Sequence, residues 1–462
     1  MNRSQQSRVE QQMRRDGVRR GVGGSSAVEF FNALTSSQML EVTEAHLPEH
    51  RERLYPPTVT LAMFLGQVLA ADGSCQQAVD GWAVSRALEG LSSQSLRTGG
   101  YCRACGRLPL SLVQTLPREG ALALSQGAPA AWGWRGRRVK LLDGTGISMP
   151  DTADNWARFP QPSCQAVGVG FPLARMCALT CLGSGALLDA AVGPHRGSGH
   201  SELDLARSLL PALRAGDLLL ADALYANYFL FAHLIEAGVD ALFEQHGSRR
   251  TDFRCGQHLG VRDHLVHWRK PCSRPAWMSP EQYQAAPEQI TVREAKVGGR
   301  ILVTTMLDAS SVDKRELDAL YRRRWNIELD LACIKTTLGM DVLACRTAAM
   351  VEKELWVHLL AYNLIRLIMA QAGLQAGCAP RQLSFKHTVQ TCNAWLPHVL
   401  SSGKPPDMGC LLAIIAAVKV GNRAGRSEPR VRKRRPKSFP CLKVPRSVAR
   451  QRKSSSPELA PR

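Results

Sequence analysis

Four polar side chains in the segment YRRRWNIELDLACIK, residues 321–335, recur at helical spacing: Tyr321, Arg324, Glu328 and Lys335. Because an α-helix advances about 100° per residue, all four fall within a sector about 60° wide. A carboxylate beside two cations could hold a divalent metal ion and a phosphate together, because carboxylate oxygens are ligands for Mg²⁺ and Arg and Lys bind phosphate oxygens. The alternative is a solvated helix on which Arg324 and Glu328 form an i,i+4 ion pair worth about 0.2–0.5 kcal/mol.

Two aspartates stand at the ends of apolar runs upstream of this segment. RRVKLLDGTGISM predicts a short strand with Asp143 at its end, before a Gly-rich turn, and DLLLAD predicts a buried strand that ends at Asp222. Ligands of open α/β sheets gather at the carboxyl ends of strands, so both aspartates can meet there while Glu328 comes in from a flanking helix. Two Mg²⁺ or Mn²⁺ ions about 3.5–4 Å apart would offset the repulsion of three carboxylates and clamp the oxygens of a phosphodiester. Singly, each aspartate is equally an ordinary cap or turn residue.

The elements that would position these residues follow an α/β pattern. ARMCALTCL and ALLDAAVG flank GSG and predict a hairpin. SELDLARSLLPAL and YFLFAHLIEAG predict helices on either side of the strand that ends at Asp222, and VDALFEQ predicts another strand. The charged row lies on a long helix that we expect to start near Asp313. The sequence therefore predicts an α/β sheet with helices packed against it.

Changes in periodicity divide the chain further. Between residues 246 and 299 the helical periodicity is lost and alternating or β-branched runs replace it, which predicts a β-rich insertion. We expect a disordered basic arm (1–26), a helical N-terminal domain that binds DNA (27–130), an α/β catalytic core (136–350), C-terminal helices (351–420) and a basic tail (421–462) that is too Pro-interrupted for a packed core.

The charge of the chain favours an anionic partner. The 462 residues carry a formal net charge of +20, and residues 421–462 contribute 14 Lys and Arg against two Glu. Basic arms on a nearly neutral body fit nucleic acid, because each phosphate that is neutralised releases counterions. A tail that merely improves solubility is the alternative.

Other classes of function find little support. LWVHLLAYNLIRLIMAQAG is interrupted by polar residues, which favours a buried helix over a membrane span. The polar N-terminal segment is not a secretory signal, so we expect the fourteen cysteines to be reduced. Cys102 and Cys105 have the spacing of half a zinc site, but no second pair follows them, and no ligand completes a site with His264 and His267. The GTG after Asp143 lacks a Walker lysine, so ATP is not expected.

The charged row also carries a family resemblance. Tyr321, Arg324, Glu328 and Lys335 match the Y-x2-R-x3-E-x6-K signature in identity and spacing, so the chain resembles the insertion-sequence-4-type DDE transposases. LLDGTGISMPDT and AGDLLLADALYAN are similar to the family's two aspartate segments, although Ala-Leu follows Asp222 where members often have an Arg-Gly step before the tyrosine. LSFKHTVQ and KRRPKSFPCLKVPR are similar to its C-terminal region, and the resemblance covers roughly residues 30–450.

The resemblance implies a ribonuclease H-like catalytic core, with the β-rich insertion between the second aspartate and the glutamate. It implies nicking at the element's terminal inverted repeats, often a hairpin intermediate, and joining of the 3′-OH to target DNA. Asp143, Asp222 and Glu328 would be the catalytic residues and would hold two Mg²⁺ or Mn²⁺ ions. A homodimer on double-stranded DNA is expected, in the cytoplasm of a bacterium and associated with its nucleoid.

The resemblance also assigns the remaining side chains. Arg324, Lys335 and Tyr321 would contact DNA phosphates, and Trp268 or Trp277 in the insertion would stack on a flipped base. Packing in the protein core is the alternative for both tryptophans. A catalytically inactive, transposase-derived DNA-binding protein and a nuclease of the same fold are the alternatives for the whole chain.

Overall fold

The computed structural model describes seven parts of the chain: residues 45–47, 54–88, 90–91, 95–163, 166–402, 408–421 and 444–454. The expected basic arm at 1–26 lies outside the described residues, as does most of the basic tail expected at 421–462.

Nine strands form one mixed sheet in the order β3-β2-β1-β4-β5-β9-β8-β7-β6. β1 and β2 pair antiparallel, as do β2 and β3, whereas β4 runs parallel to both β1 and β5. The remaining pairs are antiparallel. The strands are β1 (Val139–Ser148), β2 (Leu173–Cys181), β3 (Leu187–Pro194), β4 (Leu218–Ala221), β5 (Asp240–Glu244), β6 (Gln257–Gly260), β7 (Asp263–Arg269), β8 (Gln289–Val297) and β9 (Arg300–Thr304). The predicted α/β sheet and the β2–β3 hairpin are thus present.

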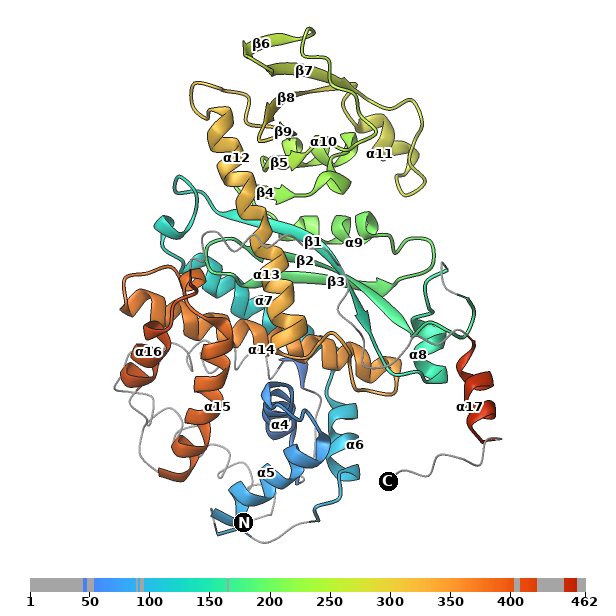
Figure 1. Cartoon of the computed structure of the whole chain (residues 1–462), viewed down its shortest axis with the longest axis vertical. Helices are drawn as coiled ribbons and strands as arrows, with labels where there is room; N and C mark the ends of the chain where they lie inside the picture. Colours follow the sequence, from blue (N-terminus) through green and yellow to red (C-terminus); the bar gives the residue numbers. More distant parts are fainter. Residues whose placement is uncertain are drawn as a thin grey trace.

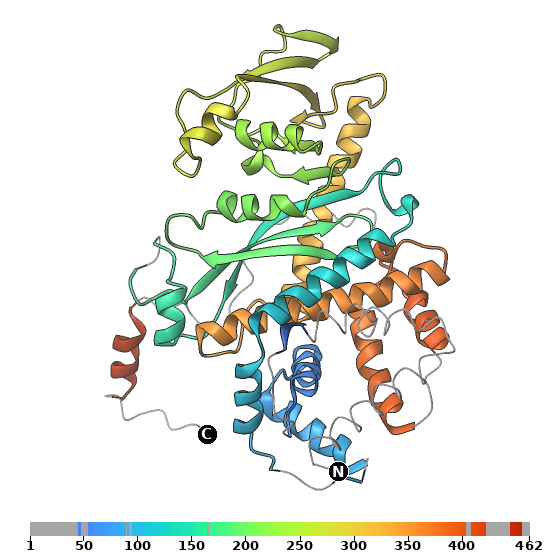
Figure 2. The same cartoon turned by 180° about the vertical axis from the view of Figure 1, so that it is seen from behind.

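Helices cover both faces of this sheet (Figures 1 and 2). α9 (Glu202–Leu209) and α10 (Tyr228–Glu236) lie on one face, and α12 (Lys314–Arg322) and α13 (Asn326–Ala332) cross the other. Successive side chains of a strand point to opposite faces. Leu141 accordingly packs in the cluster on the α13 side, whereas Leu142 packs in the cluster on the α9 side.

β1 corrects the expected position of Asp143. The strand runs through Gly144 and Gly146 to Ser148, so Asp143 lies within the strand and no turn follows it. Pairing with β2 continues along this whole length, with Asp143 opposite Ala178. The antiparallel partner therefore keeps the glycine segment extended, an influence that the local sequence does not reveal.

The strands of the segment 246–299 extend the same sheet. β6, β7 and β8 all lie in it, and β9 joins them to the edge of β5, with Thr304 opposite Leu242. A short helix, α11 (Pro280–Ala285), follows β7. The segment is therefore continuous with the central sheet (Figure 1).

Most other helices lie beyond the α13 face. They are α4 (Pro57–Leu69), α5 (Cys75–Leu88), α6 (Gly99–Arg107), α7 (Leu110–Gln126), α14 (Ala348–Gln375), α15 (Phe385–Ser402) and α16 (Met408–Ala417), while α8 (Ala153–Arg158) follows β1. Among the described residues, α14 alone is long and apolar enough to cross a membrane, and 78% of its most apolar window is buried. It is thus the buried helix that the sequence predicts.

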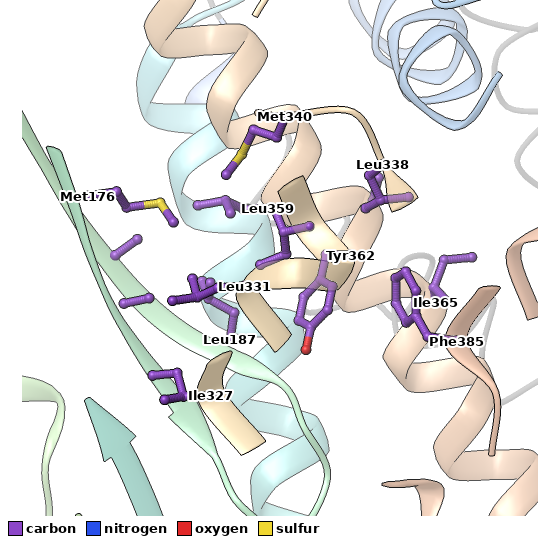
Figure 3. Close-up of a cluster of buried hydrophobic side chains, with 14 of the residues drawn as sticks. Met176, Leu187, Ile327, Leu331, Leu338, Met340, Leu359, Tyr362, Ile365 and Phe385 are labelled. Atoms are coloured by element: carbon purple, nitrogen blue, oxygen red, sulfur yellow. The ribbon is translucent and has the colours of Figure 1, made fainter. Parts of the chain in front are cut away.

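The core between the sheet and α14 holds α13 in place. Figure 3 shows Ile327 and Leu331 of α13 beside Met176 and Leu187 of the strands, with Leu359 of α14 close by. All five side chains are buried. Burying an aliphatic side chain of this size contributes about 1.5–3 kcal/mol, so the apolar face fixes which side of α13 points away from the core.

A short stretch of the basic tail forms a helix on the surface of the protein. Residues 446–454 form α17 (Arg446–Ser454). The Arg446 guanidinium lies 3.5 Å from the ring centroid of Phe171 and 3.5 Å from a carboxylate oxygen of Asp151. This helix therefore contacts the rest of the chain through an aromatic ring and a carboxylate, both of which attract a guanidinium.

Candidate active site

The two aspartates lie at corresponding places on neighbouring parallel strands. Val139 pairs with Leu218 and Leu141 with Leu220, and the same offset separates Asp143 from Asp222. β4 ends at Ala221, so Asp222 stands directly after its carboxyl end. There Asp222 caps a 3₁₀ turn, and its Oδ1 accepts from the amide of Leu224 at 2.8 Å. The parallel pairing of β1 and β4 therefore brings both aspartates to the end of the sheet at which β4 terminates.

Arg324 joins the first aspartate to the glutamate. Its Nη1 lies 3.3 Å from Oδ2 of Asp143, and its Nη2 donates to Oε1 of Glu328 at 3.0 Å. The i,i+4 pair expected of an ordinary helix is thus present, but the same guanidinium also reaches across to β1. A cation between two carboxylates offsets their mutual repulsion.

Lys335 and Tyr321 flank this centre. The Lys335 ammonium donates to the carbonyl of Gly146 at 2.9 Å and pairs with Asp341 at 3.0 Å. The Tyr321 hydroxyl lies 3.4 Å from a carboxylate oxygen of Glu244 at the end of β5. Arg324 and Lys335 thus reach β1, the strand that carries Asp143, whereas Tyr321 is buried and reaches the end of β5.

The helix that carries the row is not continuous. α12 begins after Asp313, whose side chain caps it, and ends at Arg322. A 3₁₀ turn (Arg323–Trp325), α13 and a π-helical turn (Cys333–Thr337) follow. The prediction of one long helix was wrong in this respect. π-helical turns in proteins occur often at functional sites, and here one carries Lys335.

A buried ion network fixes the opposite face of α13. Asp330 is fully buried and accepts from Arg366 at 2.7 Å. Arg381 donates to both of its carboxylate oxygens, at 2.9 and 2.7 Å. Because Asp330 lies two residues after Glu328, this network anchors the helix directly behind the catalytic candidate.

The electrostatics of Asp143 are unusual. Burial, with the neighbouring carboxylates of Asp222 and Glu202 adding to it, raises the pKa of Asp143 to about 6, although Arg324 and the Gly144 amide act in the opposite direction. Carboxylates that crowd together in a buried site titrate at higher pH because each charge disfavours the next. Such a site favours cations.

The donor chemistry fits a hard divalent cation. No group of three acidic, histidine or cysteine side chains in the described residues is arranged to hold a metal ion as it stands. Asp143 and Glu328 nevertheless share one guanidinium, so both already lie within reach of a single positive charge. Carboxylate oxygens are the ligands that Mg²⁺ and Mn²⁺ prefer. A metal ion bound there would neutralise the two carboxylates that Arg324 now neutralises.

The two tryptophans of the insertion differ in exposure. Trp268 is 2% exposed, packs edge-on against Phe231 and donates from its indole nitrogen to Glu294 at 2.8 Å. This structure therefore makes Trp268 a core residue without a free ring face. Trp277 is 44% exposed and lines a cavity of about 440 Å³ with Phe229. Base stacking remains a prediction for Trp277.

Trp325 is a candidate that the sequence reasoning missed. It follows Arg324 directly and is 57% exposed, and the next turn exposes Leu329 at 51%. Large apolar side chains that remain in water beside a charged site often contact a partner. The signal was present in the sequence, because helical spacing puts both residues on the side of the helix opposite its buried face, next to the charged row.

The residues that the sequence offered as possible zinc ligands lie in other elements of the fold, α6 and β7. Cys102 is exposed whereas Cys105 is buried, and both belong to α6. His264 is buried and contacts the carbonyl of Cys255 at 2.7 Å, and His267 contacts Thr291 at 3.0 Å. The two histidines are thus hydrogen-bonded within the protein.

Comparison with known proteins agrees with this geometry. A family profile described as the transposase DDE domain matches residues 134–364, which span β1 to the first half of α14. The chain is also similar to the transposase InsG for insertion sequence element IS4 of Escherichia coli (strain K12), with 32% identity over 327 residues. The match covers 68% of this chain and 72% of that protein.

The chain belongs to the IS4-type family of DDE transposases. It is a DDE transposase, an enzyme that cleaves DNA and transfers strands, and DNA is its substrate. The matched segment of the transposase contains the six polar residues of the site, which are Asp143, Asp222, Tyr321, Arg324, Glu328 and Lys335, and it also contains Asp330 behind them.

Proposed function

We propose that the transposase cuts double-stranded DNA at the terminal inverted repeats of its insertion sequence and joins the freed 3′-OH to target DNA, in a cut-and-paste reaction that uses two Mg²⁺ or Mn²⁺ ions. The single observation that carries this proposal is the placement of Arg324 between Asp143 and Glu328, beside the end of β4 where Asp222 stands. It brings carboxylates from two separate elements to one charge, and the carboxylate of Asp222 is near enough to Asp143 to help raise its pKa. Two bound divalent ions would stabilise the attacking and leaving oxygens of the phosphodiester.

A ribonuclease H-like core is part of the proposal. The strand order β3-β2-β1-β4-β5, with an antiparallel β1–β2–β3 meander and parallel β4 and β5, supports it. The strands from β6 to β9 would then be the insertion between Asp222 and Glu328. Residues 27–130 are proposed to bind the element's ends, and residues 351–420 to form the C-terminal helices of the core.

The protein's own residues divide the work. Asp143, Asp222 and Glu328 would hold the ions, and Lys335 and Arg324 would hold the DNA backbone beside them. Arg suits this task because its planar guanidinium makes two parallel hydrogen bonds to phosphate oxygens. Release of Arg324 from the carboxylates would free it for a phosphate. Tyr321 would contribute its hydroxyl, and Trp277 an aromatic face for an extruded base.

A homodimer on DNA, a cytoplasmic location and association with the bacterial nucleoid complete the proposal. Two ends must be brought together for transposition, and the substrate is the chromosome. The excess of basic residues supports tight, salt-dependent contact with DNA.

The test is cleavage of a labelled duplex that carries the element's own ends, with and without Mg²⁺. We expect Mg²⁺-dependent 3′-OH formation by the wild type and none by Asp143→Asn, Asp222→Asn or Glu328→Gln, while binding in a gel shift stays unchanged. Asp308→Asn is the matched control, because Asp308 is an exposed carboxylate between β9 and α12. Wild-type activity in Glu328→Gln would show that the active site is assigned wrongly.

The same assay separates the alternatives. A folded wild-type protein that binds the ends without cleaving them would be a catalytically inactive, transposase-derived DNA-binding protein. Cleavage without joining of the 3′-OH to a target duplex would indicate a nuclease.

A further inference from the structure

A fourth carboxylate, that of Glu202, lies behind β1 next to the residue that follows Asp143. Glu202 is the first residue of α9, on the face opposite α13. Its side chain lies against the backbone of Gly144, the residue after Asp143: a Cβ added at Gly144 would fall 2.3 Å from Cδ of Glu202. No real contact is this short, so Glu202 occupies space that exists only because position 144 has no side chain.

The same carboxylate is tied to the turn after the second aspartate. The Tyr225 hydroxyl donates to Oε1 of Glu202 at 2.8 Å. Tyr225 ends the 3₁₀ turn that Asp222 caps, and its ring is fully buried. Its hydroxyl also lies 3.7 Å from Sγ of Cys177, which pairs with Gly144 across β2. The hydroxyl therefore sits behind the β1–β2 pair, close to Asp143.

Local roles do not account for this placement. α9 is already capped by Ser201 and Asp204, which form a reciprocal capping box. No cation pairs with Glu202 in the part of the chain that the structure describes, and the Tyr225 hydroxyl is the one hydrogen-bond donor to it there. A surface glutamate would gain more from water than from a position against a strand backbone.

We propose that Glu202 is a positioning residue of the transposase: with Tyr225 and Gly144 it ties the turn after Asp222 to β1 beside Asp143, and so fixes the separation of the two aspartates. β4 pairs with β1 only as far as Leu141 and Leu220, so backbone pairing does not itself reach the aspartates. The Glu202–Tyr225 hydrogen bond connects the two segments beyond the last paired residues, on the face of the sheet opposite α13.

This inference rests on the proposed metal-dependent function. Ligands of a metal site must be held within about 0.5 Å of the productive geometry. Residues that orient such ligands from behind typically change metal affinity or activity by roughly 10- to 100-fold when they are replaced. We expect an effect of that size from loss of the link.

Four variants test it. Glu202→Ala and Tyr225→Phe remove the hydrogen bond, and Gly144→Ala pushes the Glu202 side chain aside. Glu202→Gln keeps an oxygen that accepts from Tyr225. The first three should raise the Mn²⁺ concentration for half-saturation by roughly 10- to 100-fold, and Glu202→Gln should stay close to the wild type. Because one link is broken in each case, Gly144→Ala with Glu202→Ala should be no worse than either alone.

The primary readout is Mn²⁺ binding to the full-length, DNA-free protein, followed by the electron paramagnetic resonance of free Mn²⁺. Thermal melting checks the fold, and cleavage kinetics should show kcat falling while the KM for DNA holds. Asp308→Ala and Tyr283→Phe are the matched controls, since Asp308 is exposed and the Tyr283 hydroxyl donates only to backbone carbonyls in the described residues.

Two results would overturn the inference while leaving the proposed function intact. One is wild-type Mn²⁺ affinity in both Glu202→Ala and Tyr225→Phe. The other is an equal loss in Glu202→Gln and Glu202→Ala, because charge rather than the hydrogen bond would then matter. A folded wild-type protein that binds no Mn²⁺ would overturn the proposed function and this inference together.

Discussion

Replacement of Asp330 by alanine should remove the ion pairs that attach α13 to the core and so destabilise the protein. The carboxylate accepts three hydrogen bonds from two guanidinium groups, those of Arg366 and Arg381, and is itself fully buried. Arg366 keeps the Tyr362 hydroxyl at 2.9 Å, and Arg381 keeps the carbonyl of Cys181 at 3.0 Å. The variant would therefore leave two partly satisfied cations in an apolar environment.

The expected cost follows from what remains. Breaking a buried ion pair by removing one partner typically costs about 3–5 kcal/mol, because the surviving charge stays desolvated. The hydrophobic contribution to this change is small, because alanine lacks only the carboxylate of aspartate and no apolar group is removed. We therefore expect the free energy of unfolding of Asp330→Ala to fall by about 3–5 kcal/mol. Asp330→Ala with Arg366→Met should recover part of it, because one uncompensated charge is removed as well.

Urea unfolding followed by circular dichroism measures this difference at constant pH. Asp252→Ala is the control: its ion pair with Arg254 is solvent-exposed, and its loss should leave the unfolding midpoint unchanged. Because Asp330 lies two residues after Glu328, the variant should also cleave DNA more slowly at temperatures where it is folded. Wild-type stability in Asp330→Ala would refute the reasoning, as would a double variant less stable than the single one.

Two further predictions concern pH and the tryptophans. The pKa of Asp143 is raised from 3.8 to about 6, chiefly by burial, so the native state holds this proton more tightly than the unfolded chain. The stability that the bound proton contributes is complete below pH 3.8 and is lost as pH rises through about 6. Urea unfolding should therefore show that the wild type loses stability relative to Asp143→Asn over this pH range. Mn²⁺ binding should weaken below pH 6, where the proton occupies the carboxylate. Equal pH profiles for the two proteins would contradict this. Trp268→Ala should lower the free energy of unfolding by about 3–5 kcal/mol because the ring is buried, whereas Trp277→Ala should leave it unchanged and slow end cleavage; the opposite order of stabilities in urea would contradict the assignment.

Local pattern was sufficient for many of the elements. The apolar runs before Asp222 and around β2 and β3 are strands, and the segments at 202–209 and 228–236 are helices. These depend on periodicity within a few residues, which the sequence displays directly. The charged row was also readable, because residues three, four and seven apart on a helix share a face.

Contacts between residues far apart in the chain could not be predicted from the sequence. Asp143 was expected at a strand end, but pairing with β2, more than thirty residues later, carries β1 through the glycines. For Trp268 the sequence left base stacking and core packing open, and contacts with Phe231 and Glu294 show that the side chain is packed. The helix α17 was not foreseen in the basic tail, and Phe171 and Asp151, which contact the guanidinium of Arg446, lie more than 270 residues before it.

By itself, then, the sequence determined the types of the elements, the family signature and the identity of the three catalytic candidates. Only the tertiary structure decided that Arg324 bridges Asp143 and Glu328, that Asp330 anchors α13 and that Glu202 reaches Gly144 from behind the sheet. The physical reason is the range of the interactions. Spacing along one helix or strand sets which face a side chain takes, whereas a contact between elements depends on strand register and on which helix packs on which face.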